Sequence, residues 1–167
     1  MALFSSGMRL TPARLNFVRI ARQTADQSVT NSTTLVDASG LSLTGLANEI
    51  YEVAGRILYE APTANDFKFA LAWTSGSLPW GMVGLVSTAG GVSGDVAPTA
   101  FGAPASGAPF TAGGAGASNQ LTLLINGTWS VGVADSTLKF QFAEFVAGAA
   151  TSATLKAGSL LKITRIA

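Results

Sequence analysis

The sequence predicts an all-β protein: an antiparallel, jelly-roll-like β-sandwich with an extended N-terminal arm. Three observations predict this fold class. Apolar and polar residues alternate with a period of two, turn signals rich in Gly and Ser recur at short intervals, and no segment shows helical periodicity. The chain has 167 residues, a length that favours one domain. About eight or nine short strands fit a sandwich or barrel, and a double-sheet jelly roll fits this count best.

A basic N-terminal arm is predicted over residues 1–28, followed by the β-sandwich domain over residues 29–167. The first 22 residues contain no acidic residue and carry four arginines, Arg9, Arg14, Arg19 and Arg22. Two interpretations remain open: a solvated, weakly structured arm, or an arm whose arginines dock on an acidic neighbouring subunit. Nucleic acid is not favoured as a partner, because four arginines neutralise few phosphates and no aromatic cluster accompanies them.

Two segments alternate most clearly between apolar and polar residues, which predicts half-buried strands. In residues 49–60 the apolar face carries Tyr51, Val53, Ile57 and Tyr59. In residues 66–74 it carries Phe67, Phe69, Leu71 and Trp73. We expect these side chains to form the core.

Residues 121–133 are predicted to form a β-hairpin around Asn126-Gly127, a dipeptide preferred in type I′ turns. Both faces of this hairpin would be partly apolar. Because an antiparallel sheet normally turns one face to water, a second apolar face indicates a sheet that also packs against another subunit.

Residues 88–118 form a Gly- and Ala-rich insertion whose only charged residue is Asp95. Small side chains give little burial to offset the entropy of ordering the backbone, which favours a flexible surface loop. Because loops of this length are often functional, a second interpretation is a loop laid over a neighbouring subunit, anchored by Phe101 and Phe110.

No catalytic, metal-binding or cofactor-binding residues are predicted. The chain has no Cys and no His, which excludes disulfides, thiol chemistry, His-based triads and ordinary zinc sites. The Gly-rich stretches lack the spacing of a phosphate-binding loop, and no Asp-rich loop suits calcium. Glu52 and Glu60 share a strand face but would lie about 26 Å apart, too far for a glycosidase pair. The sequence therefore predicts that the protein is not an enzyme.

Several stretches resemble a recurring pattern in virion proteins of tailed bacteriophages. They read TLVD from Thr34, ANEIYEV from Ala47, DFKFAL from Asp66, LKFQFA from Leu138 and LKAGSLL from Leu155, followed by Thr164-Arg165. The resemblance covers most of residues 29–167 outside the insertion. The similar proteins are β-sandwich domains of actinobacterial phages, found in minor tail proteins, fibre heads and capsid-associated proteins. The resemblance implies a homotrimer and brings no catalytic residues.

Three functions follow as hypotheses. The first is a trimeric capsid decoration protein that binds the major capsid protein or another virion protein, with the arm as a staple. The second is a tail-tip or fibre-head module that binds a host cell-surface glycan. Its best candidate is Trp80, because Ser77–Gly81 looks like an exposed turn, whereas Trp73 and Trp129 are expected in the core. The third, a trimeric domain of a bacterial surface protein, is disfavoured because the N-terminus lacks a secretory signal. Since no apolar run reaches the ~20 residues of a membrane span, we expect a protein made in the host cytoplasm that joins the virion.

Overall fold

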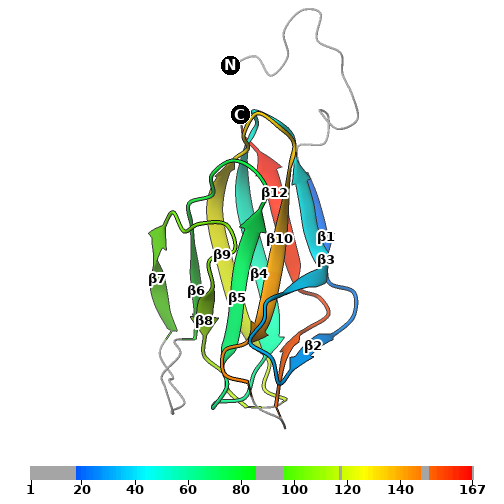
Figure 1. The fold of residues 1–167 in the computed structure, drawn as a ribbon, viewed down its shortest axis with the longest axis vertical. Coiled ribbons are helices and arrows are strands. Elements are labelled where there is room, and N and C mark those ends of the chain that lie inside the picture. Colours follow the sequence, from blue (N-terminus) through cyan, green and yellow to red (C-terminus); the bar gives the residue numbers. More distant parts are fainter. Residues whose placement is uncertain (1–17, 86–95, 117, 148–150, 167) are drawn as a thin grey trace, which may run out of the picture.

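The computed structural model describes residues 18–85, 96–116, 118–147 and 151–166, and within them the predicted all-β class is confirmed (Figure 1). These residues form twelve strands and no helix. The strands are β1 (Val18–Arg22), β2 (Gln27–Thr30), β3 (Val36–Gly45), β4 (Ile50–Glu60), β5 (Phe67–Trp73), β6 (Trp80–Leu85), β7 (Val96–Gly102), β8 (Phe110–Ala112), β9 (Leu121–Ser130), β10 (Ser136–Glu144), β11 (Ser152–Leu155) and β12 (Leu160–Arg165).

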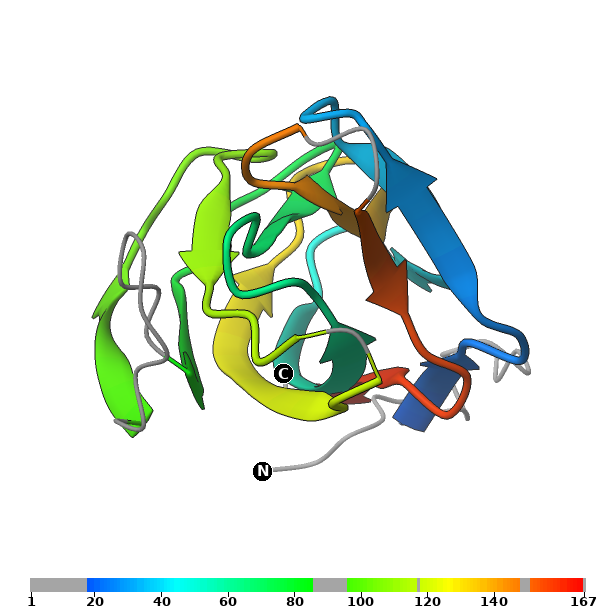
Figure 2. The ribbon, with the colours of Figure 1, turned by 90° about the horizontal axis from the view of Figure 1, so that it is seen from below.

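Two antiparallel sheets face each other across the core (Figure 2). The small sheet has the order β3-β10-β5-β8, and the large sheet contains β4-β9-β6-β7. Among the eight strands β3 to β10, the first pairs with the last, the second with the seventh, the third with the sixth and the fourth with the fifth. This nested pairing, distributed over two sheets, is that of a jelly roll, so the predicted fold is confirmed.

Four further strands extend the large sheet, and two of them show that the predicted arm boundary at residue 28 is wrong. Strand β12 pairs with β4, and β1 pairs with β12 from Val18↔Thr164 to Arg22↔Leu160. Strand β2 pairs with β11. The β-branched residues Val18 and Ile20 suit a strand, and pairing with β12 satisfies the backbone. The remainder of the predicted arm, residues 1–17, lies outside the described residues.

The core follows the predicted alternation and is held by aromatic rings from both sheets. Tyr59 of β4 stacks on Phe67 of β5, with ring centroids 4.4 Å apart. Phe67 also stacks on Phe142 at 5.8 Å, and Phe69 on Phe140 at 5.9 Å. All five side chains are fully buried. Because Tyr59 comes from the large sheet and the others from the small sheet, this cluster joins the two layers.

The hairpin predicted at Asn126-Gly127 is wrong, because β9 runs unbroken through both residues. Along it, Leu123, Ile125 and Trp129 are buried, while Leu124 is exposed. Gly127 pairs with Trp80 of β6, and a Cβ added there would lie 2.7 Å from the Trp80 Cβ and 2.7 Å from the Pro79 carbonyl oxygen. The glycine therefore admits a close neighbour instead of making a turn.

The Gly- and Ala-rich insertion is not one loop. Strand β7 pairs with β6, and β8 pairs with β5, so 96–102 and 110–112 belong to the two sheets. Backbone pairing orders these segments although their side chains are small. Residues 86–95 and 117 lie outside the described part of the chain.

Candidate functional site

The four arginines of the predicted arm do not lie together in one described segment. Arg19 and Arg22 belong to β1, whereas Arg9 and Arg14 lie outside the described residues. The Arg19 guanidinium donates a hydrogen bond to the Thr44 carbonyl oxygen of β3. Arg22 is exposed on the opposite side of the strand. Arg22 is therefore presented by a sheet, not by a loose arm.

Trp80, expected as the exposed aromatic, is buried with only 2% of its surface accessible. Its ring meets Phe110 edge-on at 4.7 Å, so Phe110 packs within its own chain instead of anchoring a loop on a neighbour. Trp129 is fully buried, as predicted. Phe101 lies in β7, and its side chain is outside the described part of the structure. Local turn signals around Trp80 could not show that β8 and its phenylalanine cover it.

The outward-pointing residues of β1, β12, β4, β9 and β6, which we call the outer face, carry apolar side chains among cations. Four large apolar side chains are exposed on it: Ile20 (64%), Leu124 (50%), Val18 (43%) and Val83 (41%). The cations are Arg22, Arg56 and Lys162, and the exposed Glu52 of β4 lies on the same face. Strand pairing places these residues on one side, because Ile20, Lys162 and Ala54 lie in one row and Arg22, Leu160, Arg56, Leu124 and Val83 in the next.

The outer face has a hollow of about 390 Å³ at a place where the outward-pointing residues, Ala54 and Gly81, are small. Its lining includes Ala54 of β4, Leu124 and Asn126 of β9, and Gly81 and Val83 of β6, with Ala54, Asn126 and Gly81 side by side in one row. We call it the outer hollow. The sequence indicated a second apolar face only through the hairpin at 121–133, which the structure does not contain. Ile20 lay within the predicted arm, and the small residues gave no signal.

The outward side of the small sheet, by contrast, is polar. Lys139 Nζ lies 2.6 Å from Asp37 Oδ2, and Gln141 Nε2 donates to Asp37 Oδ1 at 2.7 Å. The hydrogen bond from Lys139, reinforced by that from Gln141, holds the pKa of the Asp37 carboxyl below its usual value. A polar outer face suits contact with water, so the two sheets differ in what they present.

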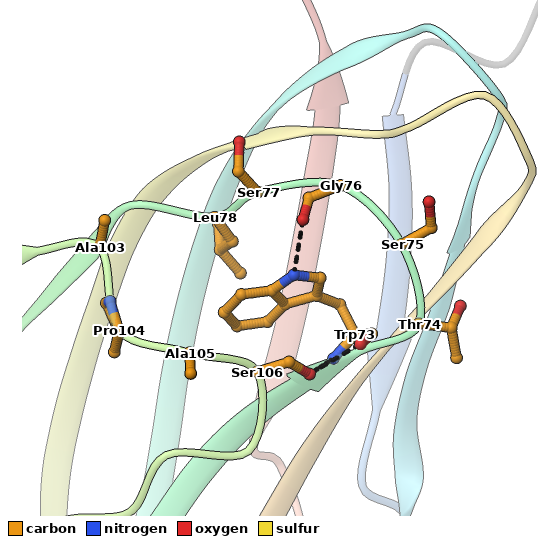
Figure 3. A pocket seen from close by; sticks show the side chains of 10 residues that line it. All are labelled: Trp73, Thr74, Ser75, Gly76, Ser77, Leu78, Ala103, Pro104, Ala105 and Ser106. Carbon is orange, nitrogen blue, oxygen red and sulfur yellow. Dashed lines mark hydrogen bonds between the residues drawn. The ribbon is translucent and has the colours of Figure 1, made fainter.

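Trp73, expected in the core, is only half-buried and lines the Trp73 hollow, a depression of about 480 Å³ between residues 73–78 and 103–106 (Figure 3). Its indole Nε1 donates to the Gly76 carbonyl oxygen at 3.1 Å. The Ser106 hydroxyl bonds to both the Trp73 amide and the Trp73 carbonyl, each at 2.7 Å. The lining has no charged side chain, and its polar groups are hydroxyls and backbone atoms.

Two buried carboxylates serve the fold. Asp66 is buried, and its Oδ1 accepts a hydrogen bond from the Gly114 amide at 2.9 Å. Glu144 accepts hydrogen bonds from the Ser32 amide and the Thr151 hydroxyl. Across the described ranges, no three His, Cys, Asp or Glu side chains come together as a metal site requires. The same ranges contain no helix that is long and apolar enough to cross a membrane.

No protein-family model matches the chain, and no curated protein matches it. Among solved structures it is similar to infectious bursal disease virus, Gt strain, at 11% identity with a TM-score of 0.22, over 90% of this chain and 38% of that chain. The Gx strain gives 10% identity and a TM-score of 0.22, over 90% and 40%. A mutant VP2 protein of this virus in T=1 particles gives 12% and 0.20, over 89% and 40%. The chain thus spans under half of these neighbours. Similarity this low assigns neither the fold nor the function. The jelly-roll assignment rests on the strand order of this chain.

Proposed function

We propose that this chain is a structural protein of a virus particle, a homotrimer that decorates a bacteriophage capsid. The observation that supports this best is the outer face of the large sheet. Val18 and Ile20 at one edge of this face, and Leu124 and Val83 separated from them by two or more strands, are exposed apolar side chains of the kind that marks protein interfaces, whereas the small sheet presents polar groups. A jelly roll serves both viral capsid and lectin domains, so the fold alone does not choose between assembly and ligand binding.

In this proposal the subunits meet through the outer face and the trimer then binds the major capsid protein. A stable interface of standard size buries about 1,200–2,000 Å². The contribution of residues 1–17 is electrostatic: Arg9 and Arg14 donate charge-assisted hydrogen bonds to an acidic capsid surface. The work of such a protein is to hold neighbouring capsid subunits together, and it needs no catalytic group.

The deciding experiment is to image virions in which this protein carries a tag at its C-terminus. Hundreds of copies over the head would support capsid decoration. A few copies at the tail end would support the second candidate below. Absence of the tag from purified particles would contradict both.

Deletion of residues 1–17 should leave the subunits folded and assembled but abolish binding to capsids stripped of the protein. The deletion ends before β1, because removing Val18–Arg22 would also remove a strand of the large sheet. Co-sedimentation with stripped capsids measures the effect, and a double Arg9→Ala, Arg14→Ala variant tests the charge alone. Unchanged occupancy with the deletion would contradict a capsid-binding role for this segment.

A second candidate function, a tail module that binds a host cell-surface glycan, is favoured by the Trp73 hollow. An aromatic ring bordered by neutral hydroxyls and carbonyls suits an uncharged, hydroxyl-rich ligand, because apolar surface supplies affinity and a few polar groups set orientation. The candidate aromatic is thus Trp73 in place of Trp80.

If the Trp73 hollow binds the receptor, Trp73→Ala should lower adsorption of phage to host cells about ten-fold or more. Trp73→Phe is the control that keeps an aromatic ring but loses the hydrogen bond to Gly76. Thermal unfolding of both purified variants separates a loss of binding from a loss of folding. Normal adsorption of a folded Trp73→Ala variant would count against this candidate.

A further inference from the structure

The outward side chains of β1 form a short series that projects from one edge of the outer face. Val18, Ile20 and Arg22 follow one another at two-residue spacing, about 7 Å apart, and all point the same way. Ile20 is 64% exposed although it is a large apolar residue. The series reads apolar, apolar, cationic along the strand.

The region around the outer hollow offers the matching series in the reverse direction. Three successive rows of the large sheet contain Leu124 beside Val83, then Ala54 at the hollow, and then Glu52. These rows are also spaced at about 7 Å. In order, these rows present apolar side chains, the hollow and an anionic side chain.

We infer that Ile20 of one copy docks into the outer hollow of a second copy, with Val18 against Leu124 and Arg22 beside Glu52 of the second copy. This deepens the proposed function, because it rests on contact between copies through the outer face. Only one direction satisfies the charges: the reverse direction would set Arg22 against Arg56, which shares its row with Leu124.

Arg22 and Glu52 are both available for an ion pair with a second copy. Within the described residues neither forms an ion pair, and both are exposed. Inside one copy they lie two strands and two rows apart, so they cannot reach each other. Most other described acids already have partners: Asp26 and Glu60 pair with Lys156, and Glu49 with Arg165.

The projecting series and the outer hollow lie at different places on one face, so the contact is head-to-tail. Such a contact lets each copy offer Ile20 to one neighbour and its hollow to the other, and it closes into a ring when the rotation permits. A two-fold contact of the outer face with itself would instead bring the cations Arg22, Arg56 and Lys162 of one copy close to the same cations of the other copy.

The test is charge exchange, read out as oligomeric state by analytical ultracentrifugation over a range of protein concentrations. The wild-type chain should associate. Arg22→Glu and Glu52→Arg should each weaken association about ten-fold or more, and the double variant should restore it. Ile20→Ala should also weaken association. Val133→Glu is the control, because Val133 is apolar and 88% exposed but lies outside both sheets.

A monomeric wild-type chain would overturn this contact and the homotrimer, whereas the virion-imaging test would still decide whether the protein lies on the head or the tail. An oligomer insensitive to all three single substitutions would also overturn the contact, although a homotrimer held by other residues would stand. Failure of the double variant to recover would overturn the pairing of Arg22 with Glu52. Thermal unfolding of each variant establishes that a loss of association is not a loss of folding.

Discussion

Replacing Phe67 with alanine is expected to lower the free energy of unfolding by about 3–5 kcal/mol, the usual cost of removing a buried phenylalanine. The side chain is fully buried, and its ring stacks on Tyr59 at 4.4 Å and on Phe142 at 5.8 Å. Since Tyr59 belongs to the large sheet, the substitution removes a contact between layers as well as apolar volume. Denaturant unfolding at one fixed protein concentration measures the effect, because association would add to stability.

The control for Phe67 is Val133→Ala, a truncation of an apolar side chain that is 88% exposed. Its effect should stay within about 0.5 kcal/mol. A loss below about 1 kcal/mol at Phe67 would mean that the sheets do not depend on this cluster, and it would contradict the packing described above.

The core was predictable from the sequence because the signal is local. In β4 and β5 every second residue is apolar, and that alternation alone selects Tyr51, Val53, Phe67 and Phe69 as buried. Trp73 follows the same alternation, but β5 ends there at the rim of the core. The ring is therefore half-buried beside residues 103–106, which no local pattern announces.

Segments whose structure depends on distant partners were not predictable. Four arginines dominate the composition of the first 22 residues and conceal the strand at Val18–Arg22, whose partner β12 lies at the other end of the chain. Trp80 has the neighbours of a turn residue, yet Phe110 covers it. For the candidate interface, Leu124 is brought to the outer face by the continuous β9, and Ala54 and Gly81 matter through their small size.

Asn126-Gly127 shows most directly how one local signal fits two structures. In a type I′ turn both residues need positive φ, which Asn and Gly tolerate. In the structure neither has it, and the pair lies inside β9. What requires the glycine is the nearby Trp80, and that residue is brought there by pairing of β6 with β9. The dipeptide alone does not contain this information.

Gly127→Ala is accordingly expected to lower the free energy of unfolding by about 1–3 kcal/mol, the usual cost of overpacking. The new Cβ would lie 2.7 Å from both the Pro79 carbonyl oxygen and the Trp80 Cβ, so the backbone must shift to admit one methyl group. Part of that shift acts on the hydrogen bond from the Thr128 amide to the Pro79 carbonyl, now 3.0 Å long. Denaturant unfolding measures the change, again at one protein concentration.

Asn126→Val is the matched control, because the two structures predict opposite results at this position. In a strand, an exposed β-branched residue is well tolerated, so stability should stay within about 0.5 kcal/mol of the wild type or rise slightly. In a type I′ turn, valine would be forced to a positive φ and would destabilise the protein strongly. A severe loss with Asn126→Val would favour the turn, whereas a loss confined to Gly127→Ala supports a continuous β9 packed against Trp80.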